Sequence, residues 1–357
     1  MQGRDKKLSD LINDRHIHLL VIIAITVLYR TKTLTGFIIP TFGNTMYHVG
    51  IIRETIETSF YPNYELSYGG GFEHFYVPAY RLLITSLSIS SGVDPMVLSG
   101  ITTIVIAVLI TLVIYSIGYR MGNQYVGLSA ALLSILSPEL TIFTSRALPE
   151  LLGLFMLPLT LYFIIRDYRS LAILTAMVTA LTHQMTLLAL ALTLFIYSLM
   201  RIRNKEKFLM GFLPLIAACL TYGAWQVYSM GTLNIFGIAQ IQYREGTIVG
   251  LEIFGRMGIA IILFLIPGLY TFFTDKVNAD HRMLLASWLI STFILTKNDL
   301  IFGLIDEKGI FMDRFFTFFV QCAVVISGFG LFYLLKGLDV QLSKVNSNEK
   351  TDSSIGK

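Results

Sequence analysis

Apolar runs of helix length recur along this chain and constrain its fold more than any other feature. Ten such stretches can be placed, each of roughly 14 to 23 residues, close to the length that crosses a bilayer as a helix. Hydrophobic residues make up 54% of the 357 and charged residues only 14%, with a mean hydropathy of +0.68. A soluble domain of this size cannot bury that much apolar surface. The sequence therefore predicts an all-α, polytopic integral membrane protein with about ten transmembrane helices, in a range of nine to eleven.

The predicted spans leave one long connection near the N-terminus. The spans are placed at residues 17–31, 96–118, 123–138, 149–165, 170–183, 186–200, 209–229, 256–273, 283–296 and 315–335. The first external loop then covers 32–95. Within it, segment 78–92 carries Arg81 among Ser and Leu, which favours a juxtamembrane amphipathic helix over an eleventh span.

The distribution of basic residues predicts the sidedness. With the N-terminus inside, 17 of the 27 Lys and Arg fall on the cytoplasmic side, including the run RIRNKEK at 201–207. This run indicates topology rather than nucleic-acid binding. We expect a multi-pass cell-membrane protein with both termini cytoplasmic. Segment 1–16 carries no convincing cleavable signal, and the polar tail 336–357 is predicted to be disordered.

Ionisable and aromatic residues concentrate on the predicted external side. The stretch 43–81 of the first loop holds two His, four Glu, two Arg, several Tyr and a Gly-Gly-Gly. The mouths of later spans bring further polar residues to the same side: Glu139, Arg146, Glu150, His183, Arg244, Asp313 and Arg314. Ionisable groups near hydrocarbon depth are costly unless they pair or face water. The pattern predicts an external polar cavity.

Simpler roles are open for several of these residues. Arg146 and Glu150 are four apart and suit a structural ion pair at a helix start. His183 suits a helix cap, and Asp313 with Arg314 suits an interfacial anchor.

Several short motifs resemble the GT-C superfamily of polytopic glycosyltransferases. They are the Tyr-His and Ile-Arg-Glu of segment 44–54, the aromatic–Pro segment 75–78, the stretch SRALPELLGLFMLPLTLY at 145–162, the His-x-x-Thr at 183–186 and the Asp-Arg-Phe at 313–315. The resemblance extends to archaeal relatives of the oligosaccharyltransferase catalytic subunit, without their soluble C-terminal domain. It implies that residues 17–335 form a GT-C-like transmembrane domain.

The resemblance implies an enzyme that takes a sugar from a polyprenyl-phosphate-linked donor and transfers it to an acceptor on the extracytoplasmic face. Membrane lipids and the donor are then the expected partners, and nucleic acid is not. The residues expected to bind substrate are His48, Arg53, His74, Arg146, His183, Arg244, Asp313 and Arg314. Arg side chains suit phosphate because the guanidinium group binds it in a bidentate manner.

The catalytic carboxylate is where the chain departs from the family pattern. Asn44 stands where the family carries its acidic residue, and an amide cannot accept a proton at neutral pH. The base is then Glu54, Glu73 or Glu150, or the protein is a non-catalytic membrane subunit on the same fold. A transporter or flippase of lipid-linked substrates is a further alternative, which the mostly apolar span interiors disfavour.

No cofactor is indicated with any specificity. The sequence has no phosphate loop, CxxC or HExxH motif. His48, His74 and His183 with Glu73 offer ligand types for a divalent cation, but their spacing does not require a metal.

Overall fold

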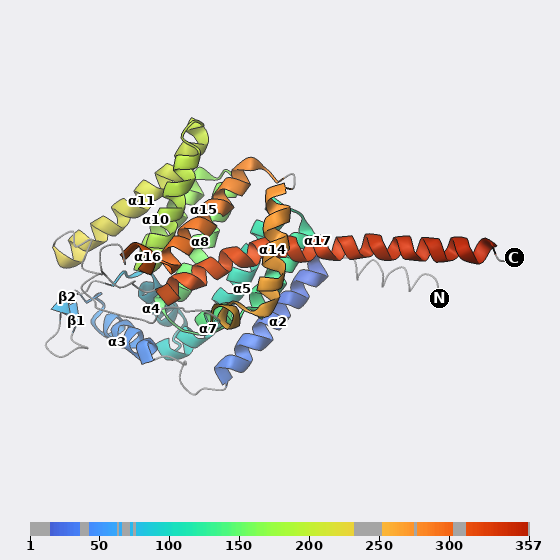
Figure 1. Cartoon of the computed structure of the whole chain (residues 1–357). Helices are drawn as coiled ribbons and strands as arrows, with labels where there is room; N and C mark the ends of the chain where they lie inside the picture. Colours follow the sequence, from blue (N-terminus) through green and yellow to red (C-terminus); the bar gives the residue numbers. More distant parts are fainter. Residues whose placement is uncertain are drawn as a thin grey trace.

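The computed structural model describes residues 15–35, 43–62, 64–65, 72–73, 76–231, 252–274, 277–302 and 312–355. These residues form α-helices and one pair of two-residue antiparallel strands (Figure 1). The elements are α2 (Arg15–Thr35), α3 (Gly43–Thr58), β1 (Tyr64–Glu65), β2 (Phe72–Glu73), α4 (Ala79–Ser91), α5 (Pro95–Met121), α6 (Gln124–Leu136), α7 (Pro138–Thr144), α8 (Pro149–Ile165), α9 (Arg169–Ala180), α10 (Gln184–Met200), α11 (Lys205–Met230), α13 (Glu252–Met257), α14 (Ile259–Thr274), α15 (Ala279–Thr296), α16 (Asp299–Phe302) and α17 (Met312–Ile355).

Each predicted span overlaps a helix, so the all-α membrane fold is confirmed. Polar side chains set several helix starts: Asp94 accepts a hydrogen bond from Met96 N at the start of α5, and Asn123 accepts two at the start of α6. Two described helices, α5 and α11, together with segment Met312–Leu338 of α17, are long and apolar enough to cross a membrane. Helices α6 and α7 meet that test together, as a pair bent by 71°. The number of helices that cross the membrane stays a prediction.

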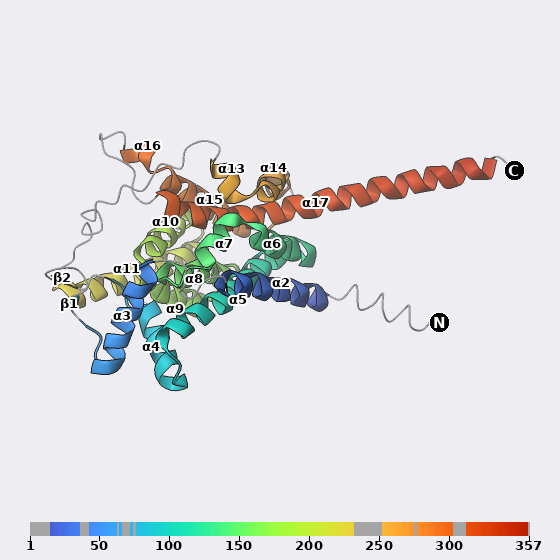
Figure 2. The same cartoon turned by 90° about the horizontal axis from the view of Figure 1, so that it is seen from below.

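The helices pack into one bundle. Helix α17 packs against α14, α6 and α15, while α10 packs against α11 and α15. Helix α5 packs against α6 and α8, and α2 packs against α5 and α6. Helix α17 projects beyond the bundle as a single long helix (Figure 2). Where the polar composition predicts a disordered tail over 336–357, α17 instead continues as far as Ile355. No proline interrupts this segment, so its backbone keeps local hydrogen bonds.

Glycine allows α14 and α17 to cross at very short distance. A Cβ added at Gly268 would collide with the backbone carbonyl oxygen of Ile326, and one at Gly330 would collide with that of Phe264. Small residues at helix crossings are typical of membrane proteins, where close backbone packing drives association.

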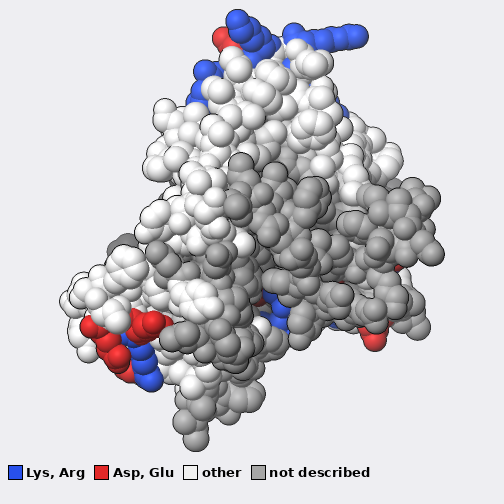
Figure 3. Space-filling model, turned by 90° about the vertical axis from the view of Figure 1, so that its left-hand side faces the viewer, with Lys and Arg blue, Asp and Glu red and all other residues white. Residues whose placement is uncertain are grey.

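The surface separates charged ends from an uncharged middle. In the view of Figure 3, Lys, Arg, Asp and Glu gather mainly at the top and at the lower left, and most of the described surface between these two places is uncharged. On α14, Leu263, Ile266 and Tyr270 are 62%, 74% and 72% exposed. Such a surface suits the hydrocarbon core of a bilayer, where charged side chains are costly.

The first loop folds at one end of the bundle. Its predicted juxtamembrane helices correspond to α3 and α4, which pack against each other and against α5. Strands β1 and β2 pair there in register, with Tyr64 opposite Glu73.

Candidate functional site

A buried carboxylate stands at the start of α8. Pro149 occupies the first turn of this helix, where its missing N–H costs nothing and its fixed φ suits the helix. Glu150 follows in the same turn, and only 10% of its side chain is exposed. The positive end of the helix dipole favours a negative charge at this position.

Glu150 joins three distant segments of the chain. Its Oε1 accepts a hydrogen bond from Arg314 Nη1, at the start of α17. His183 Nε2 lies 3.6 Å from the same oxygen. His183 also caps α10, because its Nδ1 accepts a hydrogen bond of 3.3 Å from Met185 N. A neutral His183 with an accepting Nδ1 carries its proton on Nε2, the nitrogen that faces Glu150.

Two more predicted residues lie close to this cluster. The Arg146 guanidinium lies 4.5 Å from the centroid of the Phe143 ring. Burial lowers the pKa of Arg146, while the negative charges of Glu150 and Glu139 act in the opposite direction. Asp313 precedes Arg314 at the start of α17, and its Oδ1 is buried without a hydrogen-bond partner among the described residues. We call Arg146, Glu150, His183, Asp313 and Arg314 the external cluster.

A second carboxylate, Glu139, lies beside the external cluster, and both of its oxygens accept hydrogen bonds. Glu139 Oε2 and Oε1 accept hydrogen bonds of 2.9 and 2.8 Å from Arg256 Nε and Nη2. Thr317 Oγ1 donates a further bond of 2.8 Å to Oε1. Arg256 Nη2 also reaches the backbone oxygen of Asp313, at 3.3 Å. Sequence reasoning missed Arg256, whose only signal is a lone cation where an apolar run begins.

An aromatic cluster surrounds Arg81 on α4. The Arg81 side chain is fully buried, and its Nε donates a 3.0 Å hydrogen bond to His48 Nδ1 on α3. Its Nη1 donates to Tyr61 Oη at 3.2 Å, and its guanidinium carbon lies 5.1 Å from each of the ring centroids of Tyr47 and Tyr76. His48 is thus held by an arginine that the sequence reasoning assigned only to the juxtamembrane helix.

Backbone contact connects the aromatic cluster to the external cluster. Ala79 N, at the start of α4, donates a 2.9 Å hydrogen bond to Leu181 O in the turn between α9 and α10. This turn also carries His183. The Tyr61 ring lies 5.8 Å from that of Trp225 near the end of α11, so the first loop packs on the same end of the bundle.

The remaining predicted residues lie at the rim or outside the described parts. Arg53 Nη2 forms a 2.9 Å ion pair with Asp94, and both side chains are about half exposed (51% and 49%). Asn44 is exposed near the start of α3, and Glu54 is half-buried on the same helix. Glu73 lies in β2, where only the backbone is described, and His74 and Arg244 lie outside the described residues.

The part of the chain that the structure describes offers no set of side chains that could bind a divalent cation. No group of three or more His, Cys, Asp or Glu side chains gathers there. Glu139 and Glu150 face guanidinium groups instead. These two carboxylates therefore do not fit a metal site.

No protein-family model matches the sequence, and no curated protein matches it. Solved structures do match. The archaeal oligosaccharyltransferase AglB from Archaeoglobus fulgidus, in complex with an inhibitory peptide and a dolichol-phosphate, is 13% identical with a TM-score of 0.64. The match covers 92% of this chain and 52% of AglB. ArnT from Cupriavidus metallidurans, bound to undecaprenyl phosphate, is 11% identical with a TM-score of 0.67, over 87% of this chain and 59% of ArnT.

The chain therefore has the fold of the GT-C glycosyltransferases, as its short motifs predicted. It spans little more than half the length of these structures. The likeness concerns the fold, while the identity of donor and acceptor depends on the site.

Proposed function

We propose that this chain is a membrane glycosyltransferase that transfers a sugar from a polyprenyl-phosphate-linked donor to an acceptor on the extracytoplasmic face. The observation that carries the proposal is the buried cluster of Glu150, His183 and Arg314 at one end of a GT-C fold. The polyprenyl phosphates in the AglB and ArnT structures support this class of donor.

The arginines of the external cluster suit the leaving group. When the bond between the anomeric carbon and the phosphate oxygen breaks, the phosphate leaves with the electron pair and gains negative charge. Arg314 is 22% exposed and held by Glu150, so its orientation is fixed before substrate binds. Arg146 is half-buried beside it. Preorganised cations stabilise such a developing charge more than mobile ones in water.

Glu150 is the carboxylate that the described geometry favours as base. Its Oε1 is engaged by Arg314 and faced by His183, whereas its Oε2 forms no hydrogen bond among the described residues. In the proposed step, Oε2 takes the proton of an acceptor hydroxyl while the acceptor oxygen attacks the anomeric carbon. His183 acts as a positioning residue, since both of its ring nitrogens are directed to other groups. Glu54 and Glu73 stay as alternative bases.

The test is a transfer assay on the purified chain in lipid vesicles with a radiolabelled polyprenyl-phosphate sugar. We expect Glu150→Gln to reduce turnover by about 100-fold or more, the usual cost of removing a general base. Glu206→Gln is the matched control, because Glu206 is exposed in the first turn of α11. Unchanged turnover in Glu150→Gln, with Glu54→Gln or Glu73→Gln inactive instead, would move the base to that residue.

The exposed amide of Asn44 favours a second candidate function, a non-catalytic subunit on the same fold. Asn44 stands where the resemblance calls for an acid, and its side chain is exposed at the start of α3. Two results together would overturn the enzyme proposal. The first is that Asn44→Asp creates or raises transfer activity. The second is that substitutions of Glu54, Glu73 and Glu150 do not alter the activity of the natural chain.

A further inference from the structure

A second polar site lies where the α5–α6 turn, the end of α8 and α17 meet. It is an open groove with a volume of about 900 Å³. Its lining includes Arg120, Tyr125, Arg166, Phe332 and Lys336. We call it the basic groove. Its described lining holds three cations and no carboxylate, and none of these residues belongs to the external cluster.

The basic groove and the external cluster occupy opposite ends of shared helices. Helix α8 carries Glu150 in its first turn and is followed directly by Arg166. On α17, Lys336 follows Arg314 by about six helical turns, or about 33 Å at about 1.5 Å per residue. That separation is close to the thickness of a bilayer's hydrocarbon core, about 30 Å. The groove therefore lies at the level of the opposite lipid headgroups.

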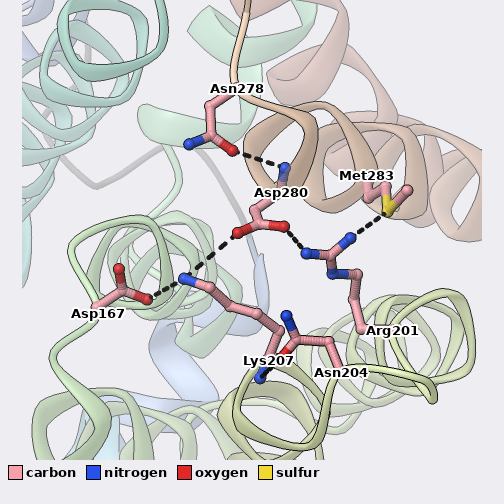
Figure 4. Close-up of polar contacts among 7 residues, drawn as sticks. All are labelled: Asp167, Arg201, Asn204, Lys207, Asn278, Asp280 and Met283. Carbon is pink, nitrogen blue, oxygen red and sulfur yellow. Dashed lines mark hydrogen bonds and ion pairs between the residues drawn. The ribbon is translucent and has the colours of Figure 1, made fainter.

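The acid next to Arg166 in the sequence is held by another cation. Asp167, next to Arg166, accepts a 2.6 Å hydrogen bond from Lys207 Nζ (Figure 4). Lys207 also lies 3.5 Å from Asp280, whose other carboxylate oxygen pairs with Arg201 (Figure 4).

The described acids near the groove are therefore occupied elsewhere. In the described part of the chain, neither Arg120, Arg166 nor Lys336 forms an ion pair with a carboxylate. Three cations around one open groove repel each other unless an anion binds between them.

The surroundings of the groove indicate that this anion belongs to a lipid. Arg166 Nη2 donates a 3.2 Å hydrogen bond to Tyr168 Oη, and Lys336 Nζ lies 6.0 Å from the Tyr333 ring centroid. Tyr beside Lys and Arg is typical of the membrane–water interface. Immediately before Lys336, Leu334 and Leu335 are 44% and 56% exposed and offer apolar surface to acyl chains.

We propose that the basic groove binds the phosphate of an anionic lipid headgroup, with the acyl chains along the exposed face of α17. Arg120, Arg166 and Lys336 contact the phosphate, and Tyr125, stacked 5.9 Å from Phe332, forms an uncharged wall. This role is independent of sugar transfer and does not rest on the proposed function.

The experiment measures lipid binding to the purified full chain by thermal stability. The chain in phosphatidylcholine nanodiscs is compared with the chain in nanodiscs that contain increasing phosphatidylglycerol, and with phosphatidylcholine nanodiscs plus inorganic phosphate. We expect phosphatidylglycerol to raise the melting temperature in a saturable way, because a ligand that binds the folded state stabilises it. Inorganic phosphate should have little effect, since it lacks the acyl chains.

Charge-removal variants then locate the site. The triple variant Arg120→Gln/Arg166→Gln/Lys336→Gln should bind phosphatidylglycerol about 100-fold more weakly, given about 1 kcal/mol for each basic residue near a lipid surface. The control Arg169→Gln/Arg203→Gln/Lys205→Gln removes the same charge at exposed positions outside the groove and should bind as the natural chain does. The single variant Lys336→Gln, on the exposed part of α17, should bind phosphatidylglycerol about 5-fold more weakly. It replaces the triple variant in the test if the triple variant does not fold.

Three outcomes would overturn the proposal. A natural chain that is indifferent to phosphatidylglycerol has no such site. Equal losses in the triple and control variants would indicate general surface charge. Equal stabilisation by inorganic phosphate would make the ligand a free phosphate rather than a lipid. Absence of sugar transfer affects none of these readouts.

Discussion

Two buried glutamates on neighbouring helices show how surroundings separate structural from chemical roles. Both oxygens of Glu139 accept hydrogen bonds from Arg256, and Oε1 accepts another from Thr317. Glu150 shares a single oxygen between Arg314 and His183. Glu139 therefore has little capacity left for a substrate, whereas Glu150 keeps one oxygen for it.

We predict that Glu139→Ala destabilises the protein without a comparable loss of intrinsic activity. Removing the Glu139 carboxylate leaves Arg256, whose side chain is 28% exposed, without its ion-pair partner. We expect this to cost about 1–3 kcal/mol of stability. The free energy of unfolding in mixed micelles measures this effect. The exposed Glu206→Ala should stay within about 0.5 kcal/mol of the natural chain. A stable Glu139→Ala that fails to transfer sugar would place Glu139 in the chemistry instead.

At the scale of elements, close helix packing and helix capping position the site. Helix α17 brings Arg314 to Glu150, and its packing on α14 depends on glycine at the crossing. Helix α5 is anchored at its start by Asp94, which also pairs with Arg53 on α3.

Two glycines on α17 should respond to alanine in opposite directions. A Cβ at Gly330 collides with the backbone of α14, whereas a Cβ at Gly337 meets nothing within 4 Å. We expect Gly330→Ala to lower stability by about 1–3 kcal/mol through overpacking. Gly337→Ala should raise it by about 0.5 kcal/mol, because alanine loses less conformational entropy in a helix. Thermal unfolding of the two variants side by side measures the contrast, and equal effects would contradict the close crossing.

Asp94 predicts a pH dependence of stability. The backbone N–H of Met96 and the Arg53 guanidinium hold the pKa of the Asp94 carboxyl below its usual range. The pKa of Asp94 is thus lower in the folded state than in the unfolded state. Its contribution to the stability of the folded state is therefore present above the unfolded pKa of about 3.9 and is lost as pH falls through the folded pKa.

The melting temperature of the natural chain should therefore exceed that of Asp94→Asn by a constant amount between about pH 5 and pH 7. This difference should narrow below about pH 4. Asn retains the cap, so the comparison isolates the charge, whose exposed position makes the effect small. A difference that grew on acidification would contradict the assigned pKa shift.

At the scale of the whole molecule, the two ends differ in chemistry. The end with the external cluster has carboxylates and arginines in paired, buried positions, and the opposite end has the basic groove and the network of Asp167, Lys207 and Asp280. The distribution of Lys and Arg predicts that the second end faces the cytoplasm.

Cysteine labelling in intact cells tests this sidedness. In a chain with Cys219 and Cys322 replaced by Ala, Glu57→Cys on α3 should react with a membrane-impermeant maleimide added outside. Arg203→Cys, between α10 and α11, should react only after permeabilisation. Both positions are exposed, so accessibility depends on the side of the membrane alone. The reverse labelling pattern would show that the membrane orientation is inverted and that the external cluster faces the cytoplasm.

Much of the fold followed from local sequence. Apolar runs of helix length predicted the helices because a backbone in lipid must satisfy its hydrogen bonds within each helix. The short motifs predicted the GT-C fold, which the matching structures confirm. They also pointed to Glu150, His183 and Arg314, which lie together in the structure.

The pairing of these residues was not predictable from spacing. The four-residue interval between Arg146 and Glu150 suggested a local ion pair, yet Glu150 pairs with Arg314 on α17, 164 positions away. Glu139 likewise pairs with Arg256 across 117 positions, and Arg81 holds His48 from the next helix. Helical periodicity reports neighbours one turn away and carries no information on which helix end lies opposite.

The sequence by itself thus determined the helices, the class of membrane protein and the chemical types at the external end, because each depends on local composition. Among the described residues, only the tertiary structure decided which carboxylate has both oxygens bonded and which keeps one oxygen free. It also decided where three cations meet with no described carboxylate among them. These depend on helix packing, since α17 alone supplies Arg314 to one end and Lys336 to the other.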